Sequence, residues 1–237
     1  MNSLSEKSFG SRLLNAQNIL TYIQALADYE APQATESIIS FKKLQDDIIE
    51  SNTKESELKQ NYRKAVKNRQ STFYDLDTSL FKLLPPIRGA VIAAYGKNSQ
   101  EADSVTAIIN KIRASKIIQP PAPAEGQEAP QTISTSQKSY GSLTKSFNDL
   151  INTLTQLGGY HPSNPNLQIA NLQAFAITLD TLNFEVAQSY QKLAFERQNR
   201  LNLYKDLSQR VQRIKSYIQA QYGLTSKIYS LVKGLSI

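Results

Sequence analysis

The chain has 237 residues and a formal net charge of +7, with no cysteine and a single histidine. The absence of cysteine excludes disulfides, thiolate nucleophiles and cysteine-ligated zinc or iron–sulfur sites. The small positive charge suits an acidic partner such as nucleic acid or an anionic membrane surface, but it is also common in ordinary soluble proteins.

Apolar residues that recur every three to four positions predict an all-α fold. We expect a first helix from residues 8–11 to about residue 28, stopped before Pro32, because proline cannot continue the hydrogen-bond ladder. Thr35 is the expected N-cap of a second helix. This second helix crosses an all-polar patch at residues 50–57 and reads as one segment of about 40 residues, ending at Tyr74.

A third helix is expected after Asp77, which can serve as its N-cap. Pro85 and Pro86 fall inside its apolar face, so either the helix proper begins at Pro86 or it is kinked there. Gly96 then supplies a left-handed stop, and Ser99 is the expected cap of a fourth helix.

Residues 118–137 combine prolines with Ala, Glu, Gln, Ser and Thr. This composition is typical of a semi-stiff linker. The prolines at residues 120–123 can also be read as a ligand for a recognition domain, but no basic anchor follows them. We therefore predict a linker.

After the linker the chain repeats its pattern. The pentapeptide that begins at Lys7 returns in similar form at Lys138, 131 residues later, and the Tyr95–Gly96 pair returns as Tyr222–Gly223. An offset of 128 aligns the later part of the second helix, from Tyr62 with Tyr190. Offsets of 127 and 123 align the third and fourth helices. The sequence therefore predicts two tandem four-helix-bundle-like repeats, residues 7–117 and 138–237, each built on a long second helix.

The change of offset from 128 to 127 has a geometric consequence. Deleting one residue inside a helix rotates everything beyond it by about 100°. We therefore expect a helix break near residues 204–206 of the second copy. The two repeats are expected either as separate units or as one intertwined bundle, which the long linker permits.

Around residues 204–226 the chain combines Leu-Tyr-Lys-Asp-Leu and Ile-Lys-Ser-Tyr-Ile with a Tyr-Gly pair and a helix headed by serine. The same shape occurs over residues 73–100. Both segments resemble parts of uncharacterised all-helical bacterial proteins with a Tyr/Phe-Gly helix stop. The resemblance implies an all-helical fold and a bacterial source, and it implies no catalytic residue.

Few residues offer chemistry. His161 lies in a Gly- and Pro-rich segment without a nearby carboxylate or co-ligand, so we interpret it as a turn residue. Metal sites inside helical bundles require Glu-x-x-His pairs, which are absent, and no phosphate-binding glycine loop occurs. We predict no catalytic, cofactor-binding or metal-binding residue. A solvated face is the expected role of the acidic residues of the second helix, Asp46, Asp47, Glu50, Glu55 and Glu57.

Basic residues form the candidate site. Lys59, Arg63 and Lys67 share one helical stripe of the first copy. A cationic stripe contacts phosphates without sequence readout and loses affinity with salt. The other interpretation is a solubilising face with local pairs such as Glu196–Arg200. The candidate contacts with an anionic partner in the second copy are Arg197, Arg200, Arg210 and Arg213.

We predict a non-enzymatic helical interaction or scaffolding protein whose partner is another protein or a second copy of itself. The alternative is binding to nucleic acid or an anionic membrane surface through the basic stripes. An enzyme ranks third, because no pair or triad of reactive groups can be assembled and no small-molecule substrate is evident. No segment approaches the roughly 20 apolar residues that cross a bilayer, and no signal peptide is recognisable, so we expect a cytoplasmic protein.

Overall fold

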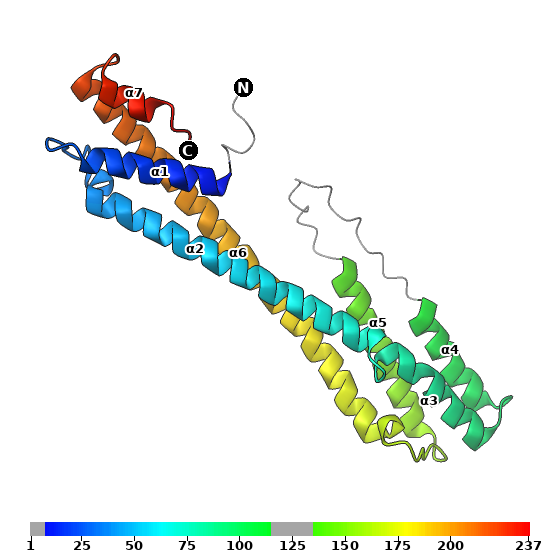
Figure 1. Cartoon of the computed structure of the whole chain (residues 1–237). Helices are drawn as coiled ribbons and strands as arrows, with labels where there is room; N and C mark the ends of the chain where they lie inside the picture. Colours follow the sequence, from blue (N-terminus) through cyan, green and yellow to red (C-terminus); the bar gives the residue numbers. More distant parts are fainter. Residues whose placement is uncertain (1–7, 115–134) are drawn as a thin grey trace. The chain divides into compact units, whose positions relative to one another are not determined.

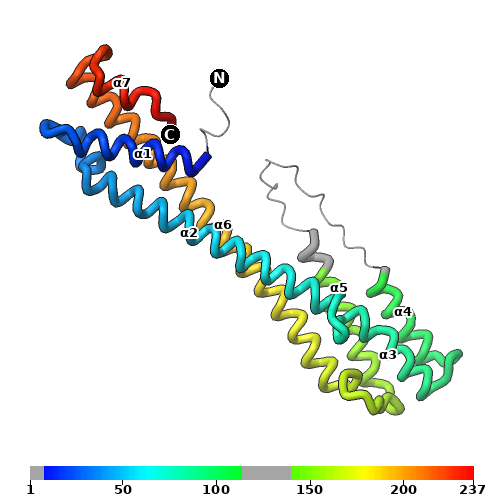
Figure 2. The backbone as a smooth tube through the Cα atoms, in the orientation of Figure 1, coloured from blue at the N-terminus to red at the C-terminus, as the bar shows by residue number. Residues whose placement is uncertain are grey.

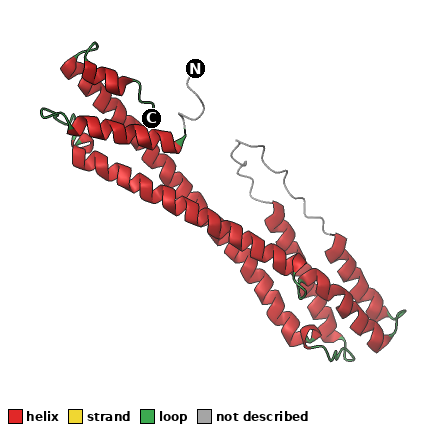
Figure 3. Ribbon diagram, viewed as in Figure 1, coloured by secondary structure: helices red, strands yellow, loops and turns green. Residues whose placement is uncertain are grey.

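The computed structural model describes residues 8–114 and 135–237, and over these residues the regular elements are all helical, without a strand (Figures 1 and 3). The predicted all-α fold is confirmed. In chain order the helices are α1 (Phe9–Gln24), α2 (Ile38–Gln70), α3 (Leu80–Tyr95), α4 (Gln100–Ala114), α5 (Thr135–Gln156), α6 (Ile169–Tyr222) and α7 (Lys227–Lys233). Short helical turns are η2 (Ala34–Glu36), η3 (Ser71–Asp75) and η4 (Pro165–Leu167).

The predicted linker, residues 118–137, lies largely outside the described residues. Its final three residues belong to α5, which begins at Thr135. Figure 2 traces the backbone of the described residues on either side of the predicted linker.

Two of the expected helix starts need correction. Thr35 is not a cap, because it lies within the 3-10 turn η2; α2 begins later, and the Ser37 hydroxyl accepts a hydrogen bond of 3.2 Å from the Ser40 amide. Asp77 is not a cap either: it is exposed and pairs with Lys82 at 2.9 Å. The expected cap at Ser99 is confirmed, since its hydroxyl accepts a 3.1 Å hydrogen bond from the Ala102 amide.

The two adjacent prolines lie inside α3. This helix begins at Leu80, so a helix that starts only at Pro86 is wrong. Pro85 and Pro86 lack the N–H groups that would otherwise bond to carbonyls of the preceding turn. Burial of Leu84 and Ile87 on either side of the prolines compensates, because each fully buried side chain of this size stabilises the fold by about 1.5–3 kcal/mol.

The expected break near residues 204–206 is wrong. Helix α6 runs without interruption over 54 residues. Tyr204 and Leu207 both lie in the core, 1% and 0% exposed, so the apolar face stays in register through the predicted break. The segment contains neither glycine nor proline, and nothing in it stops a helix. Helix α2 likewise crosses the polar patch at residues 50–57 intact and then passes into the π-helical turn η3.

The described residues form two compact units. The terminal unit, as we call it, contains residues 8–60 and 191–237, and the central unit contains residues 61–114 and 135–190. Helices α2 and α6 contribute to both. The predicted ranges 7–117 and 138–237 do not coincide with these units, since each range supplies helices to both.

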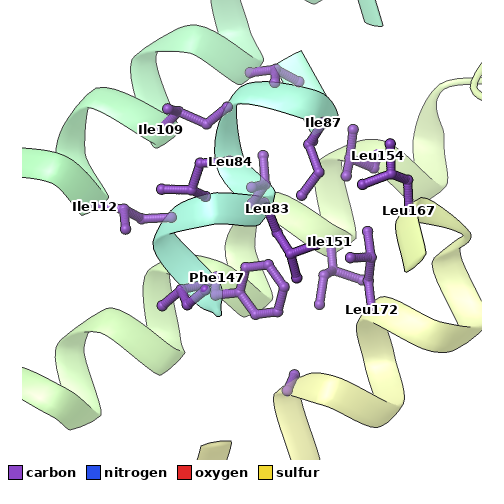
Figure 4. Close-up of a cluster of buried hydrophobic side chains, with 14 of the residues drawn as sticks. Leu83, Leu84, Ile87, Ile109, Ile112, Phe147, Ile151, Leu154, Leu167 and Leu172 are labelled. Carbon is purple, nitrogen blue, oxygen red and sulfur yellow. The ribbon is translucent and has the colours of Figure 1, made fainter. Parts of the chain in front are cut away.

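Each unit has its own apolar core. The terminal core joins faces of α1, α2, α6 and α7, and its members include Ile19, Ile23, Phe41, Ile48, Leu207, Val211, Ile214, Ile218 and Val232. Figure 4 shows the central core, where α3, α4, α5, η4 and α6 meet through Leu83, Leu84, Ile87, Ile109, Ile112, Phe147, Ile151, Leu154, Leu167 and Leu172.

The turn after α1 and the turn after α5 are stabilised in the same way. The Tyr29 hydroxyl donates to the Glu36 carbonyl at 2.9 Å, and the Tyr160 hydroxyl donates to the Leu167 carbonyl at 2.9 Å. In both cases the acceptor lies seven residues after the tyrosine, and burial raises the pKa of each phenol to about 12. Each tyrosine thereby fixes the path of its turn into the following long helix.

Glycine ends two helices as predicted. Gly96 after α3 has φ +92° and Gly223 after α6 has φ +87°. Gly96 combines this φ with ψ +155°, a region of backbone space that is essentially restricted to glycine. A Cβ at either position would meet no other atom within 4 Å, so the requirement for glycine is conformational rather than steric crowding.

Replacing Gly96 with alanine is therefore expected to destabilise the protein by about 1–3 kcal/mol, the cost of forcing an L-residue into this backbone conformation. Urea unfolding followed by circular dichroism measures the change. Gly89→Ala is the matched control, because Gly89 lies inside the same helix with open space around its Cα. It should be neutral or should stabilise by up to about 1 kcal/mol. An equal loss of unfolding free energy in the two variants would contradict the conformational requirement for glycine at position 96.

Candidate functional site

Two of the predicted basic residues hold the terminal unit together. The Arg213 guanidinium pairs with the fully buried Glu36 carboxylate at 2.7 Å. Arg210 pairs with Asp206 at 2.7 Å and donates to the backbone carbonyls of Thr35 and Ser40. Both arginines thus tie α6 to the start of α2, and their charges are already used within the fold.

Arg197 and Arg200 converge on one carboxylate. Glu55 of α2 accepts from Arg197 Nε at 3.1 Å and from Arg200 Nη1 at 3.3 Å, and its side chain is 9% exposed. The Arg200 guanidinium also lies 4.4 Å from the centre of the Phe9 ring. Glu55 is therefore buried and paired, and its expected place on a solvated face is wrong.

A second carboxylate, Glu196, lies beside the first. It accepts a 2.6 Å hydrogen bond from Ser51 and one of 3.0 Å from Asn199, and it pairs with Lys54 at 3.1 Å. The expected local pair Glu196–Arg200 is not formed, since Arg200 turns to Glu55. Burial acts to raise the pKa of the Glu196 carboxyl, but the hydrogen bonds from Ser51, Asn199 and Lys54 outweigh it, so the pKa lies below its ordinary value.

We call this set of side chains the Glu55–Glu196 network; it comprises Ser51, Lys54, Glu55, Glu196, Arg197, Asn199 and Arg200. A cavity of about 280 Å³ opens beside it, lined by Asp47, Glu50, Ser51, Lys54, Glu196, Asn199 and Leu203. The carboxylates in it are neutralised by cations from the facing helix. The network therefore joins α2 to α6 and has little charge left for an external ligand.

The other acidic residues of α2 lie at the surface. Asp46 and Asp47 pair with Lys42 and Lys43 one turn earlier, both at 2.9 Å. Among the residues that the structure describes, no group of three or more potential metal-ligating side chains comes together. His161 is exposed in the turn between α5 and η4, as expected.

Lys59, Arg63 and Lys67 remain on the surface. All three are exposed on α2, and their spacing of four residues places them on one side of the helix. No ion pair to them occurs among the described residues. Of the predicted basic positions, only these three keep an unengaged charge.

Arg69 is a buried cation whose burial was not predicted from the sequence. Its side chain is 3% exposed, its guanidinium lies 3.9 Å from the centre of the Tyr140 ring, and Nε and Nη1 have no hydrogen-bond partner. Burial lowers the pKa of this guanidinium, while the surrounding Tyr140, Tyr62 and Tyr74 act in the opposite direction. Stacking on tyrosine partly replaces the missing anion.

A signal for Glu55 was present in the sequence. It follows the buried Phe41, Leu44, Ile48 and Ser51 at steps of three and four residues, the register of the buried face of α2. A carboxylate in that register must meet a cation from another helix.

A larger hollow in the terminal unit is shallow. It has a volume of about 740 Å³, is open to solvent and is lined by Pro32, Gln209, Gln212, Arg213, Ser216 and Tyr217.

Within the described residues no helix is long and apolar enough to span a membrane. Compared with protein-family models, with curated proteins and with solved structures, the chain matches none.

Substituting Glu55 by glutamine should destabilise the protein by roughly 1–3 kcal/mol, because Arg200 would keep its burial and lose its counter-ion. Chemical unfolding at neutral pH measures the loss. Asp46→Asn removes an exposed carboxylate from the same helix and should change the stability by less than about 1 kcal/mol. A neutral Glu55→Gln variant would show that the network does not stabilise the fold.

The lowered pKa of Glu196 predicts a pH dependence of stability. Its contribution is present above the pKa of the unfolded chain and is lost as the pH falls through the folded pKa. Wild-type protein should therefore lose more stability than Glu196→Gln when the pH is lowered from about 6 to about 3. Glu57→Gln, at an exposed position of α2, is the control and should follow the wild type. If the free energy of unfolding changed with pH in the same way for all three proteins, the lowered pKa of Glu196 would be refuted.

Proposed function

We propose that the chain is a non-enzymatic helical interaction protein, which presents helix faces to a protein partner or to a second copy of itself. The observation that carries the proposal is the exposure of large apolar side chains on α6, above all Phe184 at 66% and Phe195 at 69%. Other faces of α6 pack into the terminal and central cores, so the Phe184 and Phe195 rings are not needed for core packing. Apolar side chains exposed together on one helix face mark interaction sites, and Ile177, 68% exposed, lies about two turns before Phe184 on α6.

The proposal includes an internal duplication whose two copies exchange helices. Matching contacts support it: Arg200 lies over the Phe9 ring at 4.4 Å, and Arg69 lies over the Tyr140 ring at 3.9 Å. Phe9 packs on Tyr204 at 4.6 Å, and Phe73 packs on Tyr140 at 4.8 Å.

In each of these contacts one residue comes from the first copy and the other from the second. Both partners are displaced by 131 residues between the matching contacts, from Arg69 to Arg200, from Phe9 to Tyr140 and from Phe73 to Tyr204. The terminal and central units are then equivalent assemblies of exchanged halves.

These contacts favour a single offset of 131 as far as Phe73 and Tyr204, in place of the step to 128 in the polar middle. The offset then drops to 127 at Leu80 and Leu207. The four additional residues of the first copy fall between η3 and the start of α3. In the alignment of the two copies, the corresponding part of the second copy is an unbroken stretch of α6. Losing four residues is close to one helical turn, so α6 keeps its apolar face in register without a break.

A second candidate function is binding to nucleic acid or an anionic membrane surface. The observation in its favour is that Lys59, Arg63 and Lys67 are exposed without an ion pair among the described residues. The internal pairing of Arg197, Arg200, Arg210 and Arg213 speaks against the wider basic surface. The interaction proposal therefore ranks first.

Site-specific photo-crosslinking tests the leading proposal. A photoreactive phenylalanine analogue at Phe195 in the full chain, expressed in its native cells, should give discrete crosslinked products, because an exposed ring on an interaction face touches the partner. The same analogue at Glu57, exposed on α2, is the control and should give none. Absence of products at Phe195 and at Phe184 alike would remove the proposal.

The second candidate makes a different prediction for the same protein. It requires retention on immobilised heparin at low salt, lost steeply as salt rises. The triple change Lys59→Gln, Arg63→Gln and Lys67→Gln should then abolish retention. The control triple, Lys42→Gln, Lys43→Gln and Lys205→Gln, removes the same charge. Equal retention of both triples, or none for the wild type, rules out a basic site on α2.

A further inference from the structure

In the central unit α6 carries two rows of residues at alternating steps of four and three. The first row faces the core and is buried at Leu172, Ala176, Leu179 and Val186, with Asn183 bonded to the Thr144 hydroxyl. The second row begins two positions earlier. Two residues turn a helix by about 200°, so the second row lies on the opposite side.

We call the second row the outer row; all its members are exposed, and they are Ala170, Ala174, Ile177, Thr181 and Phe184. Ile177 and Phe184 expose 68% and 66% of their surface. The Thr181 hydroxyl donates to the Ile177 carbonyl at 2.9 Å, so the helix itself satisfies its polar group. Alternating steps of four and three are the spacing by which one helix packs along another in a coiled coil.

The fold does not require this row to be apolar. On the offset of 131, its counterparts on α2 are Ile39, Lys43, Asp46, Glu50 and Thr53. Lys43 and Asp46 there form exposed ion pairs with Asp47 and Lys42. A helix in the equivalent place thus carries a charged, solvated face, and the apolar character of the outer row serves something other than core packing.

Charge indicates what kind of helix fits the outer row. Over residues 169–190 the only charged residues are Asp180 and Glu185, in a chain whose net charge is +7. Both are exposed, and they flank the row, one immediately before Thr181 and the other immediately after Phe184. Two copies of this face would bring carboxylates against carboxylates, which disfavours self-pairing.

We infer that the outer row is the docking face for one amphipathic helix of a partner protein, apolar on one side and flanked by Lys or Arg. This inference rests on the proposed function and adds to it the face, the mode of binding and the charge of the partner. Apolar contacts along Ile177 and Phe184 supply the affinity, and Asp180 and Glu185 select basic over acidic helices.

Synthetic helices test the charge selection. The probes are two peptides of about four heptads with Ile and Leu at the inward positions, one with Lys at the flanking positions and one with Glu. Fluorescence anisotropy with the full chain should show binding of the Lys peptide, weakened by salt, and an affinity for the Glu peptide lower by about tenfold or more. Asp180→Asn combined with Glu185→Gln should narrow that difference.

Variants that copy the α2 counterparts test the face. Ile177→Asp combined with Phe184→Thr should weaken binding of the Lys peptide by about tenfold or more, while the circular dichroism spectrum and melting temperature stay close to wild type, because both positions are exposed. Ile39→Asp is the control: it removes an apolar side chain that is 83% exposed on α2 and should leave the affinity unchanged.

Unchanged binding by the double variant, or equal affinities for the two peptides, overturns the inference. A wild-type dimer in sedimentation that the double variant dissociates also overturns it, since the face would then serve self-association. If crosslinks at Phe195 persist while the peptide experiment fails, only the docking face is wrong. If both fail, the proposed function fails as well.

Discussion

The carboxylate of Glu55 has to meet two guanidinium groups before α2 and α6 can lie together in the terminal unit. Its side chain is 9% exposed, and an unpaired carboxylate at such a depth would cost several kcal/mol. Arg197 and Arg200 remove this cost only when α2 and α6 are in one register. This network therefore aligns α2 and α6 within the terminal unit, and the apolar contacts of the terminal core follow from that alignment.

The apolar faces explain why the chain folds into two units that each draw on both halves of the sequence. Helix α1 and the first part of α2 bury Ile19, Ile23 and Phe41 against Leu207 and Ile214 of α6. Helices α3 and α4 bury theirs against α5 and the first part of α6. Short amphipathic helices have no stability of their own, so each depends on its partner on a long helix.

Local rules made much of the fold predictable from the sequence. Apolar spacing identified the helices, and Gly96, Gly223 and Ser99 marked their ends because each acts within a few residues. The partner of each face was not predictable, since the same apolar spacing fits many partners. The burial of Glu55 and Arg69 was not predicted from the sequence either. A charged residue is expected to be solvated until its neighbours in space are known. Arg197 lies 142 residues after Glu55 in the chain, and Tyr140 lies 140 − 69 = 71 residues after Arg69.

The terminal unit also constrains the order in which the chain can fold during synthesis. The Tyr204 hydroxyl donates to the Phe9 carbonyl across 195 residues, and the buried apolar residues of α1 and α2 share one core with residues of α6 and α7 from Tyr204 onward. The residues of the central unit are complete at Tyr190, before those of the terminal unit, so we expect the central unit to fold first during synthesis. Each doubling of the closing loop adds about 0.6 kcal/mol of entropic cost, so the final closure is thermodynamically cheap but late. We therefore expect the nascent chain to be prone to aggregation until the residues beyond Tyr204 emerge.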